Sequence, residues 1–139
     1  MKIQFIHRAQ LREEKIEIDW PELEKRIKRQ IKPKSSRILK CDGIERWRVT
    51  SNNGHKIGMQ IGSTPHQTKA ITYEMIKLAF DTVMNNEQFN SHKFRERYKD
   101  QYEAGPCRFS MAGGILVELG VATLMPADTE DDCYYIKKP

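Results

Sequence analysis

The chain has 139 residues, of which 38% are hydrophobic and 31% charged, a composition typical of one globular domain or of two small lobes with a common core. This composition excludes a largely disordered chain, and no apolar run approaches the roughly 18 residues needed to span a bilayer. The first residues contain no apolar stretch long enough for a secretion signal, so we expect a cytoplasmic protein without a membrane partner. The three cysteines are an odd number and lie far apart, which predicts neither a disulfide framework nor a zinc site.

Positive charge is concentrated in the first half of the chain. Residues 1–70 carry 16 Lys or Arg against 8 Asp or Glu, a net charge of +8, whereas residues 71–139 carry 8 against 11, a net charge of −3. The segment KRIKRQIKPKSSRILK, residues 25–40, has eight basic residues and no acidic one. Such asymmetry is typical of proteins that bind a polyanion.

A helix is predicted at residues 20–31. Asp19 can cap it, Pro21 suits its first turn, and Glu22 stands three residues after the cap. Apolar residues recur every four positions and predict a buried stripe of Leu23, Ile27 and Ile31. The opposite side would present Lys25, Arg26, Lys28 and Arg29 to solvent, either as an ordinary solvated face or as a binding surface.

Three strands are predicted after this helix, at residues 36–41, 44–50 and 56–61, while residues 62–70 read as a loop. Asp42-Gly43 is a strong hairpin signal between the first two strands. For the second connection we expect a three-residue loop, Asn52-Asn53-Gly54, which pairs Val49 with Ile57 and Trp47 with Met59. This register collects one apolar face, made of Ile38, Trp47, Val49, Ile57, Met59 and Ile61.

The other face of this meander would be basic and polar. It would carry Arg37, Arg46, Arg48, Thr50, Lys56 and Gln60, with Gly58 leaving room for a close approach. Beside the basic helix it forms a plausible phosphate-binding surface, although the polar side of an antiparallel sheet more often faces water. The face lacks the aromatic platform typical of proteins that bind single strands or RNA. Two weaker strand signals lie nearer the N-terminus, in KIQFIHRAQ and EEKIEI.

The second half has the period of helices. One helix is predicted from the Thr72 cap to Asn85, a second after Ser91, and a third in the stretch CRFSMAGGILVELG, residues 107–120. Two strands, VATLM and CYYIKK, would follow, joined by the acidic PADTEDD. We therefore expect an α+β fold. A basic lobe at residues 1–70 (an N-terminal helix and a three-stranded antiparallel meander) would join a three-helix and hairpin lobe at residues 71–139, within one compact unit.

This order of three helices and a hairpin resembles the winged helix-turn-helix domain. The resemblance covers residues 71–138 and implies a third helix in the major groove, with Arg108 and Ser110 at its leading end as candidate DNA contacts. Two features oppose that role. Gly113-Gly114 is costly in mid-helix unless another backbone packs closely, and the wing would present Asp128 and other acids to phosphate. We therefore expect the third helix to be packed rather than inserted in a groove.

No constellation of nucleophile, base and orienting group is found, nor any cluster of metal ligands, so we expect no catalytic residue, metal or cofactor. The leading hypothesis is a non-catalytic protein that binds nucleic acid, double-stranded DNA in preference to RNA. One alternative is a protein-interaction module, such as a subunit, adaptor, inhibitor or homodimer, that uses the acidic wing and the third helix. Another is the recognition domain of a larger DNA-processing or restriction-type enzyme.

Overall fold

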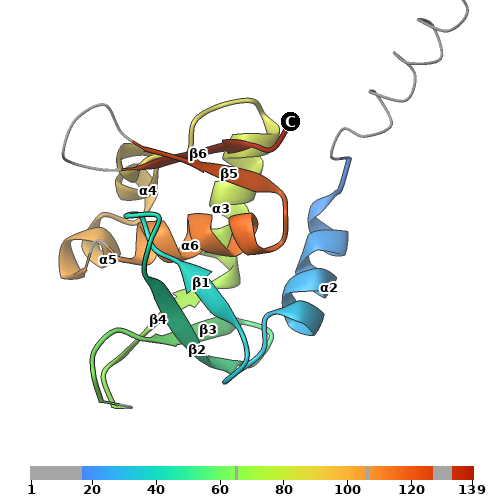
Figure 1. The fold of residues 1–139 in the computed structure, drawn as a ribbon. Coiled ribbons are helices and arrows are strands. Elements are labelled where there is room, and N and C mark those ends of the chain that lie inside the picture. The colour runs from blue at the N-terminus through green and yellow to red at the C-terminus, as the bar shows by residue number, and fades with distance from the viewer. Residues whose placement is uncertain (1–16, 65, 106, 127–132) are drawn as a thin grey trace, which may run out of the picture.

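A four-stranded antiparallel sheet and a separate two-stranded hairpin lie on opposite sides of one central helix (Figure 1). The computed structural model describes residues 17–64, 66–105, 107–126 and 133–139. Their elements are, in order, α2 (Trp20–Gln30), β1 (Arg37–Leu39), β2 (Arg46–Asn52), β3 (Lys56–Gln60), β4 (Thr68–Thr72), α3 (Tyr73–Met84), α4 (Ser91–Arg97), α5 (Lys99–Ala104), α6 (Cys107–Glu118), β5 (Ala122–Met125) and β6 (Tyr134–Lys137). The fold is thus α+β, as predicted. The N-terminal strand signals fall almost wholly outside the described residues.

Helix α2 begins and packs as its sequence predicts. The Asp19 carboxylate accepts a hydrogen bond from the backbone N–H of Glu22 at 3.0 Å, which satisfies one of the helix's free N-terminal donors. Leu23, Ile27 and Ile31 are buried. The end of α2 is fixed to the sheet by Asn52 of β2, whose amide donates to the carbonyls of Ile27 and Ile31 at 3.1 and 2.8 Å.

The first hairpin also confirms its prediction. β1 pairs with β2 so that Ile38 lies opposite Trp47, and Gly43 in the turn has a φ of 74°, a conformation that favours glycine. One carboxylate oxygen of Asp42 accepts hydrogen bonds from the backbone N–H groups of Ile44 and Glu45 at 2.8 and 2.9 Å. The turn is therefore stabilised by its own side chain.

The predicted register of the second hairpin is wrong. Val49 pairs with Met59 rather than with Ile57, and Asn52 pairs with Ile57, because the strand contains a bulge between Val49 and Ser51. Relative to the prediction, the pairing of Val49 shifts by two residues, and a shift of two leaves the same side chains on each face. The predicted apolar face is consequently buried, apart from one residue: Ile61 lies beyond the end of β3 and is 38% exposed.

A fourth strand, β4, replaces part of the loop predicted at residues 62–70. β4 pairs along β3, with Ile71 opposite Ile57 and Lys69 opposite Met59. Its sequence has no clear alternation of apolar residues, because Ile71 is the only buried side chain among its five residues. The prediction of a three-stranded meander is therefore wrong by one strand. The bulge also closes the space expected at Gly58, which lies beneath the hydroxyls of Thr50 and Ser51.

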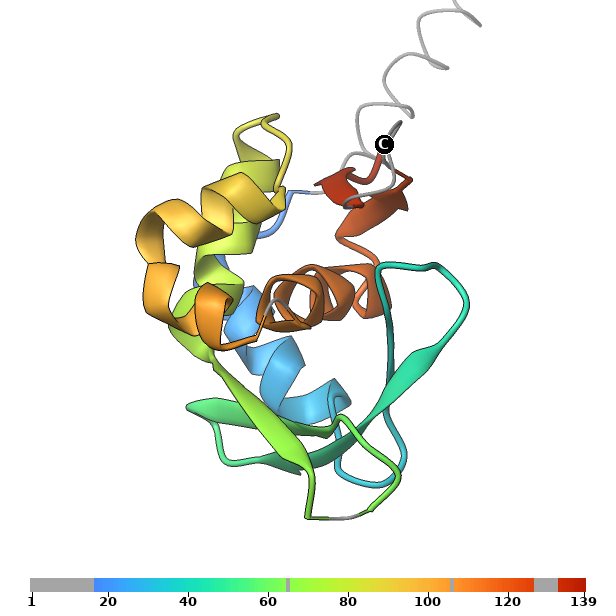
Figure 2. The same ribbon diagram turned by 90° about the vertical axis from the view of Figure 1, so that its left-hand side faces the viewer.

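The second half contains the predicted helices, with one interruption. The helix expected after Ser91 breaks into α4 and α5 at Tyr98, whose φ and ψ of −126° and 53° are not helical. Helix α6 lies between the sheet and the β5–β6 hairpin in both views (Figures 1 and 2), and its residues from Phe109 to Leu116 are all buried. The expectation that this helix is packed is confirmed.

The two glycines of α6 mark its closest contacts. A Cβ on Gly113 would collide with the ring of Tyr135, and one on Gly114 would stand 2.8 Å from the backbone oxygen of Leu39. β6 and β1 therefore approach the helix from two sides, and one hydrophobic core joins both halves of the chain. The two predicted lobes form one packed body.

A disulfide links Cys41 to Cys133, across 92 positions in sequence. The prediction from the cysteine count was therefore wrong on this point, because the spacing of cysteines along the chain does not determine which ones the fold brings together. Here the turn of the first hairpin and the start of β6 place the two Cα atoms 5.5 Å apart. Cys107 is a free thiol.

Candidate functional site

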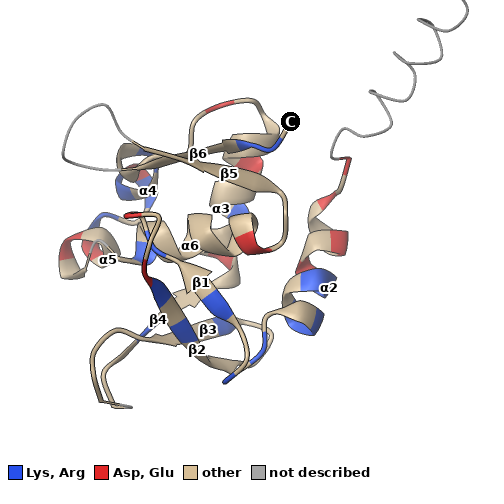
Figure 3. Ribbon diagram, viewed as in Figure 1, with Lys and Arg blue, Asp and Glu red and all other residues tan. Residues whose placement is uncertain are grey.

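The outward face of the four-stranded sheet gathers arginines from two neighbouring strands. Arg37 of β1 lies directly opposite Arg48 of β2, and Arg48 in turn lies opposite Gln60 of β3. Arg46 is two positions from Arg48 and so projects from the same face. All three arginines are exposed, and in Figure 3 the neighbouring strands β1 and β2 both carry blue segments, which mark Lys and Arg. The sequence predicted this grouping correctly.

These three arginines differ in the hydrogen bonds and ion pairs that their side chains make. Arg37 donates to the backbone oxygens of Lys34 and Ser36 at 2.7 and 3.2 Å. Arg46 donates to the Arg37 carbonyl at 3.4 Å and lies 3.6 Å from the carboxylate of Glu118. Among the residues that the structure describes, Arg48 has no ion-pair or hydrogen-bond partner for its guanidinium. Like-charged neighbours held this close attract anions from solution.

Helix α2 adds a second group of exposed cations. Within the described part of the chain, Lys25, Lys28 and Arg29 have no acidic partner, whereas Arg26 pairs with Glu22 at 3.6 Å. Helix α2 meets the sheet at the β2–β3 turn, since the side chain of Lys28 lies 3.5 Å from the position a Cβ on Gly54 would take. Lys56 follows this turn. Lys28 and Lys56 therefore lie near one end of β2, whereas Arg46 and Arg48 lie toward its other end.

A cationic pocket of about 470 Å³ opens at the start of β2, lined by Lys40, Arg46, Arg48, Gln60, Ile61, Gly62 and Ser63. The strand register explains its position. The pairing of β2 with β3 ends at Arg48 and Gln60, so the start of β2 extends past β3, and Arg46 lines the pocket together with the segment that follows β3. Lys40 and Ser63 were not among the predicted site residues, although the Asp42-Gly43 turn predicts that Lys40 lies across from Glu45.

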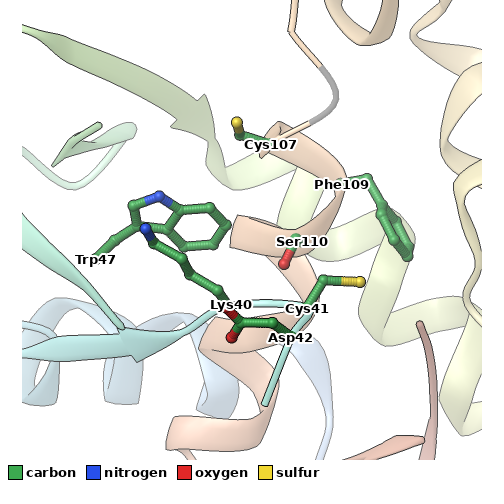
Figure 4. A pocket seen from close by; sticks show the side chains of 7 residues that line it. All are labelled: Lys40, Cys41, Asp42, Trp47, Cys107, Phe109 and Ser110. Carbon is green, nitrogen blue, oxygen red and sulfur yellow. The ribbon is translucent and has the colours of Figure 1, made fainter. Parts of the chain in front are cut away.

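An apolar pocket of about 290 Å³ lies on the other side of Lys40 (Figure 4), lined by Lys40, Cys41, Asp42, Trp47, Cys107, Phe109 and Ser110. In Figure 4 the side chain of Lys40 runs along the ring of Trp47; its Nζ lies 5.6 Å from the ring centroid and 3.0 Å from a carboxylate oxygen of Glu45. The two backbone hydrogen bonds in the turn lower the pKa of Asp42, which favours its ionised form.

The two residues predicted on α6 do not join this surface. Arg108 donates to the backbone oxygens of Ala70 and Gln101 at 3.0 and 3.4 Å, which places it at the β4 edge, across the sheet from β1. Ser110 was expected to be exposed and is only 4% exposed, because its hydroxyl and backbone oxygen both face the hydroxyl of Tyr135 at 3.2 Å. Burial raises the pKa of Tyr135 to about 12.

In the ranges that the structure describes, no group of three or more His, Cys, Asp or Glu residues could hold a metal ion. None of the described helices is long and apolar enough to cross a membrane. The acidic segment between β5 and β6, residues 127–132, lies outside the described residues.

No protein-family model matches this sequence, and no curated protein or solved structure shows significant similarity to it. Function is therefore inferred from the surface itself.

Proposed function

We propose that this protein binds nucleic acid, and double-stranded DNA in particular, through phosphate contacts made by the outward face of the sheet and by α2. The observation that carries this proposal is the exposed arginine group of Arg37, Arg46 and Arg48, in which Arg48 has no acidic partner among the described residues. Arginine is well suited to phosphate because its planar guanidinium offers several donors in a fixed geometry.

The chemistry of the face favours a duplex backbone over unpaired bases. The outward residues of the four described strands include no aromatic side chain, and Trp47 is buried on the inner side. Proteins that bind single strands or RNA without paired structure rely on exposed aromatic rings for stacking. A cationic face without such rings suits contacts that position a backbone and do not read bases.

The winged-helix resemblance of residues 71–138 stays a prediction, and it adds little to this function. Helix α6, which would be the recognition helix, is surrounded by the core. The interaction-module alternative rests largely on the acidic segment at residues 127–132, beyond what the structure describes. The role of a recognition domain within a larger enzyme is compatible with the same basic surface.

The test is fluorescence anisotropy of a labelled random-sequence duplex, titrated at about 50 and 200 mM salt. Affinity is expected to fall steeply between the two salt concentrations, because each phosphate contact releases counterions. Arg46→Gln with Arg48→Gln should weaken binding similarly for all sequences. It should also reduce the slope of log affinity against log salt by about 2, roughly one unit for each lost contact.

The matched control is Arg95→Gln with Arg97→Gln, which removes the same charge from exposed positions of α4. This variant should bind as the unmodified protein does, if position matters and net charge alone does not. Equal affinity for the Arg46/Arg48 variant and the unmodified protein would refute the proposed surface.

A further inference from the structure

We propose that the apolar pocket and the cationic pocket together hold one unpaired nucleotide, with its base beside Trp47 and Phe109 and its phosphate beside Lys40, Arg46 and Arg48. This inference rests on the proposed nucleic-acid function and adds a preference for a base that has left its stack. It assigns a base to the apolar pocket, which phosphate contacts along a regular duplex would leave empty.

The two pockets share one lining residue, Lys40. Its side chain starts on β1 and passes along the ring of Trp47, so that its ammonium group lies 5.6 Å from the ring centroid. Trp47 in turn stands between Arg46 and Arg48 in the strand, and strand alternation sends the tryptophan to the inner side and the arginines to the outer side. Lys40 and three consecutive residues of β2 therefore line the two pockets, with Trp47 in the apolar one and Arg46 and Arg48 in the cationic one.

The apolar pocket has the chemistry of a base site. Aromatic side chains, Trp47 and Phe109, form part of its wall, and the disulfide at Cys41 adds an apolar, polarisable surface. Asp42 supplies a polar edge: its Oδ1 accepts the two backbone hydrogen bonds of the turn, and its Oδ2 has no partner in the described structure. Enzymes and readers that extract a base hold it by stacking and by hydrogen bonds to its edge, and a carboxylate can accept from an exocyclic amino group.

The cationic pocket has the chemistry of a phosphate site. Its wall carries three positive side chains, Lys40, Arg46 and Arg48, together with Gln60, Ile61, Gly62 and Ser63. Among the described residues, the acidic groups in ion pairs with these cations are Glu45 and Glu118, both exposed, and exposed ion pairs contribute little. A phosphate can displace them without leaving a buried charge unpaired.

A base can reach the inner pocket only when it is unpaired. The pocket lies between the first hairpin and the N-terminal half of α6, behind the face that carries the arginines. A base within a duplex is stacked between its neighbours and cannot extend to this depth, so a bulged, mismatched or terminal nucleotide is the form that fits.

The experiment compares two labelled duplexes of identical sequence, one fully paired and one with a single bulged base, by anisotropy titration with the full chain. The bulged duplex should bind about tenfold more tightly, as expected for stacking of one base on aromatic side chains. Equal affinity for the two duplexes would overturn the pocket assignment. If both bind with the expected salt dependence, the proposed function survives; if neither duplex binds, both proposals fail.

The variant that tests the pocket is Cys107→Trp, which fills the cavity from the first residue of α6. It should remove the preference for the bulged duplex and leave the affinity for the paired duplex unchanged. Cys107→Ser keeps the volume of the pocket and should keep the preference. A preference that persists in Cys107→Trp would overturn the proposal.

If Cys107→Trp does not fold, tryptophan fluorescence provides a second test of whether a base binds beside Trp47. The chain has two tryptophans, so Trp20→Phe leaves Trp47 as the only one. Its emission should change saturably with the bulged duplex and much less with the paired one. Emission that responds identically to both duplexes would count against a base beside Trp47.

Discussion

The outward face of the sheet and helix α6 are both places where the sequence puts polar side chains that could meet DNA, yet the fold treats them in opposite ways. On the sheet, Arg46 and Arg48 are exposed, and their contacts are few and weak. On α6, Arg108 and Ser110 are already bonded to Ala70 and Tyr135. A polar group whose hydrogen bonds are already made within its own protein has few donors or acceptors free to bind a ligand.

This difference follows from the neighbours of each element. The sheet has core on one side and solvent on the other, so alternation alone separates its basic residues from its apolar ones. Helix α6 has β1 on one side and β6 on another, each close enough to exclude a side chain at Gly114 or Gly113. Its polar side chains must therefore find partners inside, since an unpaired buried polar group is costly.

The largest expected effect concerns the disulfide, which links the β1–β2 turn to the start of β6. Replacing Cys41 and Cys133 together by serine should lower the free energy of unfolding by about 4 kcal/mol, because the bridge closes a loop of 92 positions that the unfolded chain would otherwise leave open. Denaturant unfolding under non-reducing conditions measures it. Cys107→Ser is the control and should change little.

The Cys41–Cys133 disulfide also bears on the predicted cytoplasmic location. Disulfides persist mainly in oxidising environments, whereas a cytoplasmic protein was predicted from the sequence. Unfolding that is identical with and without a reducing agent would contradict a stabilising bridge and would remove this conflict.

The next largest effect is expected at the contact between α6 and β1. Gly114→Val should destabilise the protein by about 3 kcal/mol, since its Cβ would press on Ile38 and on the backbone oxygen of Leu39. Gly120→Ala is the comparison: it has open space around it, and only its φ of 75° opposes a side chain, at a cost of about 1 kcal/mol. Thermal unfolding of both variants would separate crowding from backbone strain; an unaffected Gly114→Val would mean that α6 is less closely packed.

A smaller effect depends on pH and on the buried Tyr135 beneath α6. Its pKa is raised from 10.0 to about 12 by burial, so the unfolded chain loses this proton first. The stability that the neutral phenol contributes is complete below pH 10 and is lost as the pH rises toward 12. Relative to Tyr135→Phe, the protein should therefore lose about 1 kcal/mol between pH 8 and pH 11.

Both proteins should carry Cys107→Ser in this comparison, so that no free thiol attacks the disulfide at high pH. A difference in stability between them that does not change with pH would contradict the raised pKa.

Most of the secondary structure could be predicted because its signals are local. The Asp19 cap, the Asp42-Gly43 turn and the Thr72 cap all depend on residues within a few positions, and each is present in the structure. The exposed cations of α2 and of the sheet also follow from helical and strand periods alone. The apolar and polar faces of the sheet were predicted correctly even though the register of β2 against β3 was wrong, because a shift of two residues leaves each side chain on the same face.

What escaped prediction depends on contacts between distant segments. The bulge beside Thr50, the strand β4 and the pairing of Cys41 with Cys133 are set by tertiary neighbours that no local pattern records. The burial of Ser110 and the two pockets around Lys40 have the same origin. For the candidate site, the sequence could therefore supply the charged residues of the surface but not the cavities beside them.

The smallest expected effect gives the sharpest form of the comparison between the sheet and α6. Arg48→Gln and Arg108→Gln each remove one positive charge, so the two variants have the same net charge. Arg48→Gln should weaken binding of the paired duplex about threefold at low salt, because it removes a phosphate contact. Arg108→Gln should leave the affinity unchanged within experimental error, because its guanidinium is committed to Ala70 and Gln101. Equal losses for the two variants would mean that overall charge, and not the sheet face, governs binding. A greater loss of affinity for Arg108→Gln would indicate that DNA contacts the N-terminal end of α6, as the winged-helix resemblance implies.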